Sequence, residues 1–292
     1  MNLIEEAAKR LRQLEAAGVT RAAHAAHDAP SMPPRLVPGE PGKRPLESRP
    51  APARTLDLAR LQASGFITPA LQHSKLMQEF RLIKRPLIKH ALGRSATPGH
   101  NRNLIMVTSA LPSEGKSFVA VNLAMSLAME VDCRVLLVDA DVLAPSVPEL
   151  LRIEPAKGLM DVLTGDGSLL QETVLSTNVE RLSLLLAGTP HSNAAEFLAS
   201  EAMTSLLAEL SSRFPDRIVV FDSPPLLATT ESRALATHMG QVVVAVEAQR
   251  TTHAALESAL STVESCPVVY TLLNKTPESR VGSYHGAYDY GS

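Results

Sequence analysis

The feature that most constrains the fold is a series of short, continuously apolar runs that alternate with helical segments from residue 103 onward. Strands that are apolar at every position are buried on both faces, as in a parallel sheet. Parallel neighbours need a long crossover between them, and the intervening segments carry a helical pattern. We therefore predict an α/β domain with a doubly wound, mostly parallel sheet and helices on both faces. The expected strands are 104–108, 134–139, 182–187, 218–222, 242–247 and 268–274, and the expected helices are 116–130, 193–212, 230–239 and 252–264.

The residues that precede these runs have a different character. Residues 1–27 contain a short amphipathic helical pattern that would need a surface to dock on. Eight prolines between Asp28 and Arg54 exclude a packed core there, so we expect an extended, disordered linker over 28–70. The apolar face of the first segment consists of Ile4, Ala8, Leu11 and Leu14.

Order is expected to resume at residue 71, with a helix from Ser74 that Pro86 kinks or breaks. We expect the main domain to cover 71–275 and a flexible tail to cover 276–292.

Composition limits the classes of protein that this chain can belong to. With two cysteines, neither a disulfide framework nor a zinc cluster is plausible, which indicates a reducing cytoplasm. No apolar run is long enough to span a bilayer, and the charged N-terminus is unlike a secretory signal. We therefore expect a cytoplasmic protein whose membrane association depends on a partner.

Charge is distributed unevenly along the chain. Residues 1–103 carry 17 Lys and Arg against 8 Asp and Glu, and the remainder carries 11 against 22. A basic leader can bind an acidic partner, a membrane surface or the acidic domain itself. A solvated linker is the simpler interpretation of residues 28–54, and we expect no nucleic-acid partner.

The stretch VTSALPSEGKSF, residues 107–118, joins a strand end to a helix start through a loop. Strand, loop, Gly-Lys-Ser and helix form the arrangement of a phosphate-binding loop, which predicts a sheet of the P-loop NTPase type. Backbone N–H groups and the positive end of the helix receive phosphate oxygens. Lys116 can reach the β and γ phosphates, and the Ser117 hydroxyl can ligate Mg²⁺. The strict pattern has glycine where this chain has Ala110, so the flanking strand and helix carry the assignment.

Three carboxylates follow two other predicted strands. Asp139 and Asp141 end one strand, and because they are two residues apart both can project toward one side. Asp222 ends another strand, just before a pair of prolines. A metal-bound triphosphate needs hard oxygen ligands, and phosphoryl transfer needs a base. One such aspartate is as often a turn residue or a helix cap, but two sites behind a phosphate loop favour catalysis.

The tail, GSYHGAYDYGS, holds three of the four tyrosines in the chain. Its glycines favour flexibility, so a tyrosine can enter the active site of a neighbouring subunit. The alternatives are an inert disordered tail or an aggregation-prone aromatic cluster. The clustering of Tyr284, Tyr288 and Tyr290 favours phosphoacceptors.

These motifs resemble those of a known family. VTSALPSEGKS, VLLVDADVLAPS and IVVFDSPPLL look like the Walker A, A′ and B motifs of bacterial tyrosine kinases, which are similar to the ATPases that position septa and partition chromosomes. QEFRLIKRPLIKHAL, AGTPHSNAAEFLASEAM and LLNK are more closely similar to the exosortase-associated tyrosine autokinases of exopolysaccharide gene clusters. The resemblance covers residues 75–275.

The resemblance implies a protein-tyrosine autokinase that uses ATP and Mg²⁺, and whose activator is a membrane-embedded polysaccharide chain-length regulator on a separate chain. The implied catalytic residues are Lys116, Asp139, Asp141 and Asp222, with Asp139 nearest the tyrosine hydroxyl. The nucleotide would be held by Ser113, Glu114, Gly115, Lys116, Ser117 and Phe118, and its base by Asn274. The metal would be held by Ser117, Asp141 and Asp222.

Self-association is a further implication. Family members assemble rings through a Glu, Arg, Arg trio spaced by three on a helix. Aligned on Phe80 and Arg81, this chain has Gln78, Arg81 and Lys84 at those positions. Lysine cannot reproduce the bidentate pairing of arginine, so a basic solvated helix is an equal alternative to an interface.

Two other functions stay open. A switch ATPase of the partitioning type transfers phosphate only to water, and it needs a lysine at the position of Leu111, which favours the kinase. A nucleotide-binding scaffold without phosphoryl transfer is the third class.

Overall fold

The structure is a computed structural model, and it describes residues 53–71, 74–93, 101–165, 170–213 and 217–277. All of them belong to one unit of the chain, Ser48–Ser292. The expected N-terminal helix, the first part of the expected linker, and Tyr284, Tyr288 and Tyr290 lie outside the described residues.

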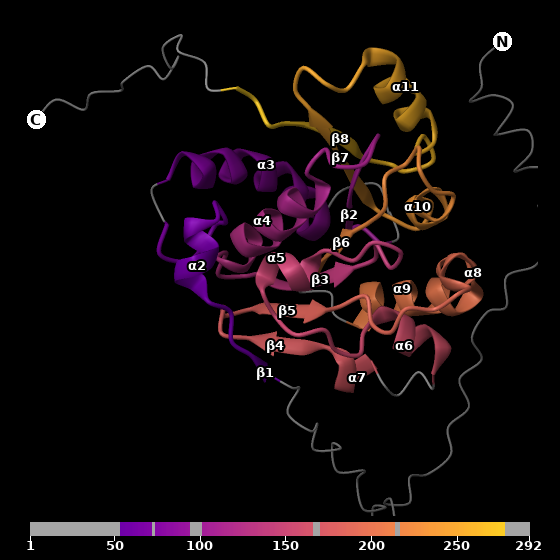
Figure 1. The fold of residues 1–292 in the computed structure, drawn as a ribbon, viewed down its shortest axis with the longest axis horizontal. Coiled ribbons are helices and arrows are strands. Elements are labelled where there is room, and N and C mark those ends of the chain that lie inside the picture. The colour runs from indigo at the N-terminus through magenta and orange to yellow at the C-terminus, as the bar shows by residue number, and fades with distance from the viewer. Residues whose placement is uncertain (1–52, 72–73, 94–100, 166–169, 214–216, 278–292) are drawn as a thin grey trace, which may run out of the picture. The chain divides into compact units, whose positions relative to one another are not determined.

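Eight strands form one sheet, in the order β1-β4-β5-β3-β6-β2-β7-β8 (Figure 1). Every neighbouring pair is parallel except β4 and β5. The prediction of a mostly parallel P-loop sheet is therefore confirmed. The strands are β1 (Ala53–Arg54), β2 (Leu104–Ser109), β3 (Arg134–Asp139), β4 (Leu175–Thr177), β5 (Leu182–Leu185), β6 (Arg217–Asp222), β7 (Gln241–Glu247) and β8 (Val269–Asn274).

Helices cover both faces of the sheet, because alternate residues of each central strand point to opposite sides. In β2, Ile105 and Val107 pack into one apolar cluster, and Leu104 and Met106 pack into the other. The first cluster is closed by α2 (Leu58–Ala63), α3 (Lys75–Leu92), α4 (Lys116–Ala128) and α5 (Val147–Leu151). The second is closed by α6 (Leu159–Thr164), α7 (Leu170–Thr173), α8 (Ala194–Leu198), α9 (Glu201–Arg213), α10 (Glu231–Ala236) and α11 (His253–Ser261).

The fold begins earlier than the sequence suggests. Residues 53–70 were expected to belong to the linker, but they form β1 and α2, and Leu56, Leu61 and Ile67 are buried. The side chains of two asparagines hold this segment, since Asn178 Oδ1 accepts from Leu56 N at 2.8 Å and Asn122 Oδ1 accepts from Ile67 N at 2.7 Å. Its few apolar residues follow no clear period, so only their tertiary contacts reveal the order.

Two expected helices also differ from the prediction. Pro86 lies on the exposed side of α3 and does not break it, because solvent can reach the carbonyl that its missing N–H leaves free. The expected helix 193–212 is split into α8 and α9, with Ser200 at the break. The Ser200 hydroxyl donates to the Phe197 carbonyl at 2.7 Å and accepts from Met203 N at 3.4 Å, which ends one helix and starts the next.

Candidate active site

The phosphate-loop sequence forms a tight turn between β2 and α4. Ser113 has φ 66° and Gly115 has φ 90°. A Cβ on Gly115 would come within 2.1 Å of Asn274 Nδ2, so this position requires glycine on two counts. Ala110 is fully buried and is not among the residues with positive φ, which explains why alanine stands where the strict pattern has glycine.

The segment after β6 holds the start of the loop in place. The Ser109 and Ala110 carbonyls accept from Leu226 N at 2.8 Å and Leu227 N at 3.2 Å. The Thr108 hydroxyl donates to the Pro224 carbonyl at 2.7 Å. The two motifs that sequence analysis placed on separate strands are therefore hydrogen-bonded into one rigid edge.

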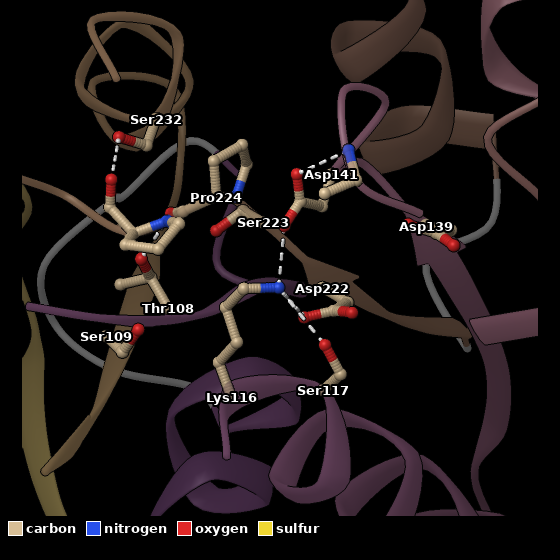
Figure 2. A network of polar contacts seen from close by, with 12 residues as sticks. Thr108, Ser109, Lys116, Ser117, Asp139, Asp141, Asp222, Ser223, Pro224 and Ser232 are labelled. Atoms are coloured by element: carbon tan, nitrogen blue, oxygen red, sulfur yellow. Dashed lines mark hydrogen bonds and ion pairs between the residues drawn. The ribbon is translucent and has the colours of Figure 1, made fainter. Parts of the chain in front are cut away.

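Lys116 is the centre of the site (Figure 2). Its Nζ lies 2.8 Å from Asp141 Oδ2, 3.4 Å from Asp222 Oδ1 and 3.1 Å from Ser117 Oγ. Burial acts to lower the pKa of Lys116, but the attraction of Asp222 and Asp141 outweighs burial, and the pKa is raised. Lys116 is therefore a permanent cation between two carboxylates that come from different strand ends.

Asp222 is the more deeply buried of the two partners. Burial raises its pKa, and the attraction of Lys116 with the hydrogen bond from Ser117 offsets only part of that effect. Within the described residues, Asp222 Oδ2 has no hydrogen-bond partner.

Asp139 is placed differently from the expectation that it and Asp141 project together. It is opposite Asp222 in the β3–β6 register, yet its side chain lies apart from Lys116 in Figure 2. Its Oδ2 accepts from Val147 N at 3.1 Å at the start of α5, and its Oδ1 finds no partner in the described part of the chain. Burial and the neighbouring charge of Asp222 raise the pKa of Asp139 to about 7.

These oxygens fit a magnesium ion. Asp222 has a buried carboxylate oxygen without a partner and lies beside the Ser117 hydroxyl, and oxygens of these kinds are the hard ligands that Mg²⁺ prefers. Among the described residues no cluster of three or more His, Cys, Asp or Glu side chains has metal-binding geometry. Ser117, Asp141 and Asp222 are the residues that would hold the ion.

A second group of hydrogen bonds holds the phosphate loop from the ends of β7 and β8. Most of these contacts were not predicted from the sequence. The carboxylate of Glu114, an expected nucleotide-binding residue of the loop, is buried and accepts from Leu111 N at 2.9 Å and from the Thr251 hydroxyl. Asn274 Nδ2 donates to the Glu114 carbonyl at 2.9 Å, and Lys275 Nζ donates to the Ser113 carbonyl at 2.7 Å. The pairing of Asn274 and Lys275 directly after the last predicted strand was the only sequence signal for this group.

Phe118 and Lys84 use their side chains inside the fold. The Phe118 ring packs on Phe66 with centroids 5.2 Å apart. Lys84, an expected interface residue, is 4% exposed and donates to the Ser126 carbonyl at 2.6 Å while pairing with Glu130 at 2.8 Å. It therefore stabilises the end of α4 and is not on the surface, unlike Gln78 and Arg81, which are exposed.

The loop, its lysine and the carboxylates of two neighbouring strands together define a P-loop ATPase domain. A family model described as an AAA domain matches residues 104–275. Tyrosine-protein kinase YwqD of Bacillus subtilis is 32% identical over 186 residues, which cover 64% of this chain and 76% of that protein. The chain therefore belongs to the bacterial tyrosine kinase family.

Other similar proteins are also bacterial tyrosine kinases. Tyrosine-protein kinase ptk of Acinetobacter johnsonii is 33% identical over 183 residues, and this chain spans 24% of its length. The solved structure of the BceF tyrosine kinase domain is 26% identical and has a TM-score of 0.56, with 76% of this chain and 91% of that one covered. Every helix in the described part of the chain is too short or too polar to cross a membrane.

Proposed function

We propose that this chain is a protein-tyrosine autokinase that transfers the γ-phosphoryl group of ATP to tyrosines of its own tail, in trans. The observation that carries the proposal is the position of Lys116 between Asp141 and Asp222, next to Ser117. A cation held at the mouth of a phosphate loop by two carboxylates can exchange those partners for phosphate oxygens when a nucleotide binds. The membership of the tyrosine kinase family supports phosphoryl transfer to protein.

In the proposed reaction, the phenolic oxygen forms a bond to the γ-phosphorus as the bond to the β–γ bridging oxygen breaks, and the phenolic proton passes to a carboxylate. Mg²⁺, held by Ser117, Asp141 and Asp222, supplies charge neutralisation at the phosphates. The backbone of Ser113–Phe118 and the charge of Lys116 orient the triphosphate. Asn274 contacts the base through its side-chain amide.

Asp139 is the proposed proton acceptor. A general base works best with a pKa near the operating pH, and Asp139 combines a pKa of about 7 with an unpartnered oxygen. Its carboxyl is fully buried, so the segment 140–146 between β3 and α5 has to open before a hydroxyl reaches it.

A switch ATPase of the partitioning type is the alternative. Leu111 stands where that class needs a lysine, its N–H is bonded to Glu114, and its side chain packs against the second apolar cluster. An apolar, packed side chain cannot reach across to a partner's phosphates, which favours the kinase.

One experiment separates kinase, ATPase and scaffold. The full chain is incubated with labelled ATP and Mg²⁺ beside Lys116→Met and a chain that ends at Val281. Label on the wild type that is lost in both variants supports a tail-directed kinase. Free phosphate without labelled protein indicates an ATPase, and neither product indicates a scaffold or an enzyme that needs its activator. Mixing Lys116→Met with the Val281 chain restores label on the longer protein only if transfer occurs in trans.

The partners are proposed from the family resemblance. We propose that the chain is a cytoplasmic protein of exopolysaccharide export, of the exosortase-associated kind, and that a membrane-embedded chain-length regulator activates it at the inner membrane. The basic residues before Ser48 are the proposed contact with that regulator. Deleting residues 1–47, which belong to a separate unit of the chain, is expected to leave the described fold intact, and unchanged regulator binding by the deleted chain would remove this assignment.

Tail phosphorylation is proposed to dissolve assemblies in which one subunit's tail occupies another's site. Phosphates of about −1.5 to −2 charge each repel one another and the aspartates of the site. Light scattering before and after ATP treatment tests this, and an oligomer of unchanged mass speaks against it.

A further inference from the structure

An apolar groove of about 440 Å³ lies between α3 and β8, along one edge of the sheet. Its lining is mostly aliphatic and aromatic, with Glu79 and Lys275 as its charged members, and it includes Leu82, which is 66% exposed. An exposed apolar groove of this size is typical of a binding site rather than of plain surface. The walls include Leu76, Phe80 and Ile83 of α3, Phe118 of α4, and Tyr270 and Leu272 of β8.

The strand that forms one wall has an unpaired edge. β8 pairs with β7 on one side, and none of the described strands pairs with its other side. The opposite edge of the sheet is β1, which has only two residues, whereas β8 has six. A long free edge beside an apolar groove attracts another strand unless something covers it.

We propose that the groove holds the chain's own unphosphorylated tail, residues 278–292, as an antiparallel strand on the free edge of β8. The chain leaves the described fold at this place, since Thr276 lines the groove and Pro277 is the last described residue. A tether this short gives an effective concentration on the order of millimolar. The other candidate occupant, the amphipathic segment near the N-terminus, is joined to the described fold at Ala53 in β1. β1 lies at the opposite end of the eight-strand order from β8, so that connection gives no comparable effective concentration at the groove.

The spacing of the tail tyrosines fits a strand. Side chains alternate between the two faces of a strand, so Tyr284, Tyr288 and Tyr290 all fall on one face. His285 and Asp289 fall on the other face, toward solvent. Three aromatic rings on one face can bury against the groove while the backbone pairs with β8. The stretch 277–283, which contains a proline and a glycine, is long enough to reverse the chain.

Phosphorylation is incompatible with this position. A phosphate of about −1.5 to −2 charge loses its solvation among the apolar side chains of the groove, and Glu79 also lines it. Lys275, the cation in the lining, is already paired with the Ser113 carbonyl and with Glu247. The groove therefore withholds the unmodified tail from neighbouring active sites and releases it once it is phosphorylated. Only this last step rests on the proposed kinase function.

Hydrogen exchange of the full chain, without nucleotide or Mg²⁺, tests the docking. The amides of β8 that face away from β7 are compared between wild type and a variant with Tyr284, Tyr288 and Tyr290 replaced by serine. We expect exchange roughly tenfold faster in the serine variant, because its tail no longer covers the edge. Leu82→Glu, on α3, is expected to give the same acceleration. Val131→Glu is the matched control, because Val131 is 75% exposed outside the groove, and its exchange at β8 stays at the wild-type rate.

Peptides identify the occupant. A synthetic peptide of residues 278–292 added to the serine variant restores protection of β8, and the same peptide phosphorylated on its tyrosines does not. The proposal is overturned by equal exchange in wild type and the serine variant, by restoration with a peptide of residues 2–17 instead, or by protection that depends on protein concentration, which points to a second copy. A chain that protects β8 but takes up no label from ATP keeps the groove assignment, so failure of the docking and failure of the kinase function give different results.

Discussion

At the scale of single residues, burial determines how the site behaves. Asp139 and Asp222 are fully buried, and Lys116 is 9% exposed. Charges removed from water interact strongly, so the protonation of each group depends on its neighbours. Lys116 contacts two carboxylates, whereas Asp139 has only a backbone N–H as partner and its pKa is raised to about 7.

Replacing Asp139 by Asn is expected to flatten the pH dependence of stability in the nucleotide-free chain. Its pKa is raised from 3.8 to about 7, so between these values the native chain binds a proton that the unfolded chain lacks. Stability from this group is greatest at low pH and falls as pH rises through 7. Between pH 5.5 and 7.5 the loss is about 2 kcal/mol, which urea unfolding at the two pH values measures. Asp132→Asn, an exposed site, is the control, and an Asp139→Asn chain with the wild-type slope contradicts the prediction.

Gly115→Ala is expected to abolish nucleotide binding. The new Cβ meets Asn274 Nδ2 at 2.1 Å, and φ of 90° is unfavourable for alanine. Gly65→Ala is the matched control, because Gly65 also has positive φ, of 82°, but has nothing within 4 Å of its Cβ. Both variants lose about 1 kcal/mol of stability from the backbone. Titration with a fluorescent ATP analogue distinguishes them, and wild-type affinity in Gly115→Ala would show that the loop tolerates the clash.

At the scale of helices and strands, the sequence was most informative where burial is continuous. The six predicted strands are all present, because a fully apolar run of this length indicates a central parallel strand. β1 and β4 have two and three residues, too few for any period to be recognised. The interruption between α8 and α9 depends on one serine that caps both, which no periodicity reports.

The residues of the site also divide into those that local sequence motifs predict and those that they do not. Lys116, Asp141 and Asp222 were predicted from local motifs, since loops after parallel strands meet at one edge of the sheet. The separation of Asp139 from them depends on the turn taken by the backbone after β3, and the contacts of Glu114 depend on residues 137 and 160 positions away. Such contacts follow from the order of strands in the sheet, which the motifs do not contain.

Lys84→Met is expected to destabilise the fold by roughly 2 kcal/mol without changing self-association. The substitution keeps the apolar stem but leaves the Ser126 carbonyl, near the end of α4, without its donor. Thermal unfolding and light scattering measure the two effects. Arg85→Met, on the exposed side of the same helix, is the control and is expected to leave the unfolding midpoint unchanged. If Lys84→Met changes the mass of the oligomer without lowering stability, Lys84 belongs to the interface after all.

At the scale of the whole molecule, the boundary of the domain lies before Ala53 rather than at residue 71. Residues 53–70 complete the sheet at β1 and bury Leu56, Leu61, Phe66 and Ile67 against the first apolar cluster. This edge is therefore part of the cooperative unit.

A chain that begins at Ser48 is expected to unfold at the same midpoint as the full chain, and one that begins at Leu71 to lose roughly 5 kcal/mol. Each large apolar side chain that is removed contributes about 1.5–3 kcal/mol by burial, and part of that sum is offset by the entropy of ordering the segment. Urea unfolding of the three chains measures the difference. Equal midpoints for all three would restore the boundary predicted from the sequence.

The grip of Lys275 on Ser113 has a mechanical consequence. Lys275 Nζ bonds the Ser113 carbonyl of the phosphate loop and the Glu247 carboxylate at the end of β7, so tension on the residues that follow Lys275 acts on the loop as well as on the sheet. Whatever pulls on or lets go of that end acts directly on the grasp of the nucleotide.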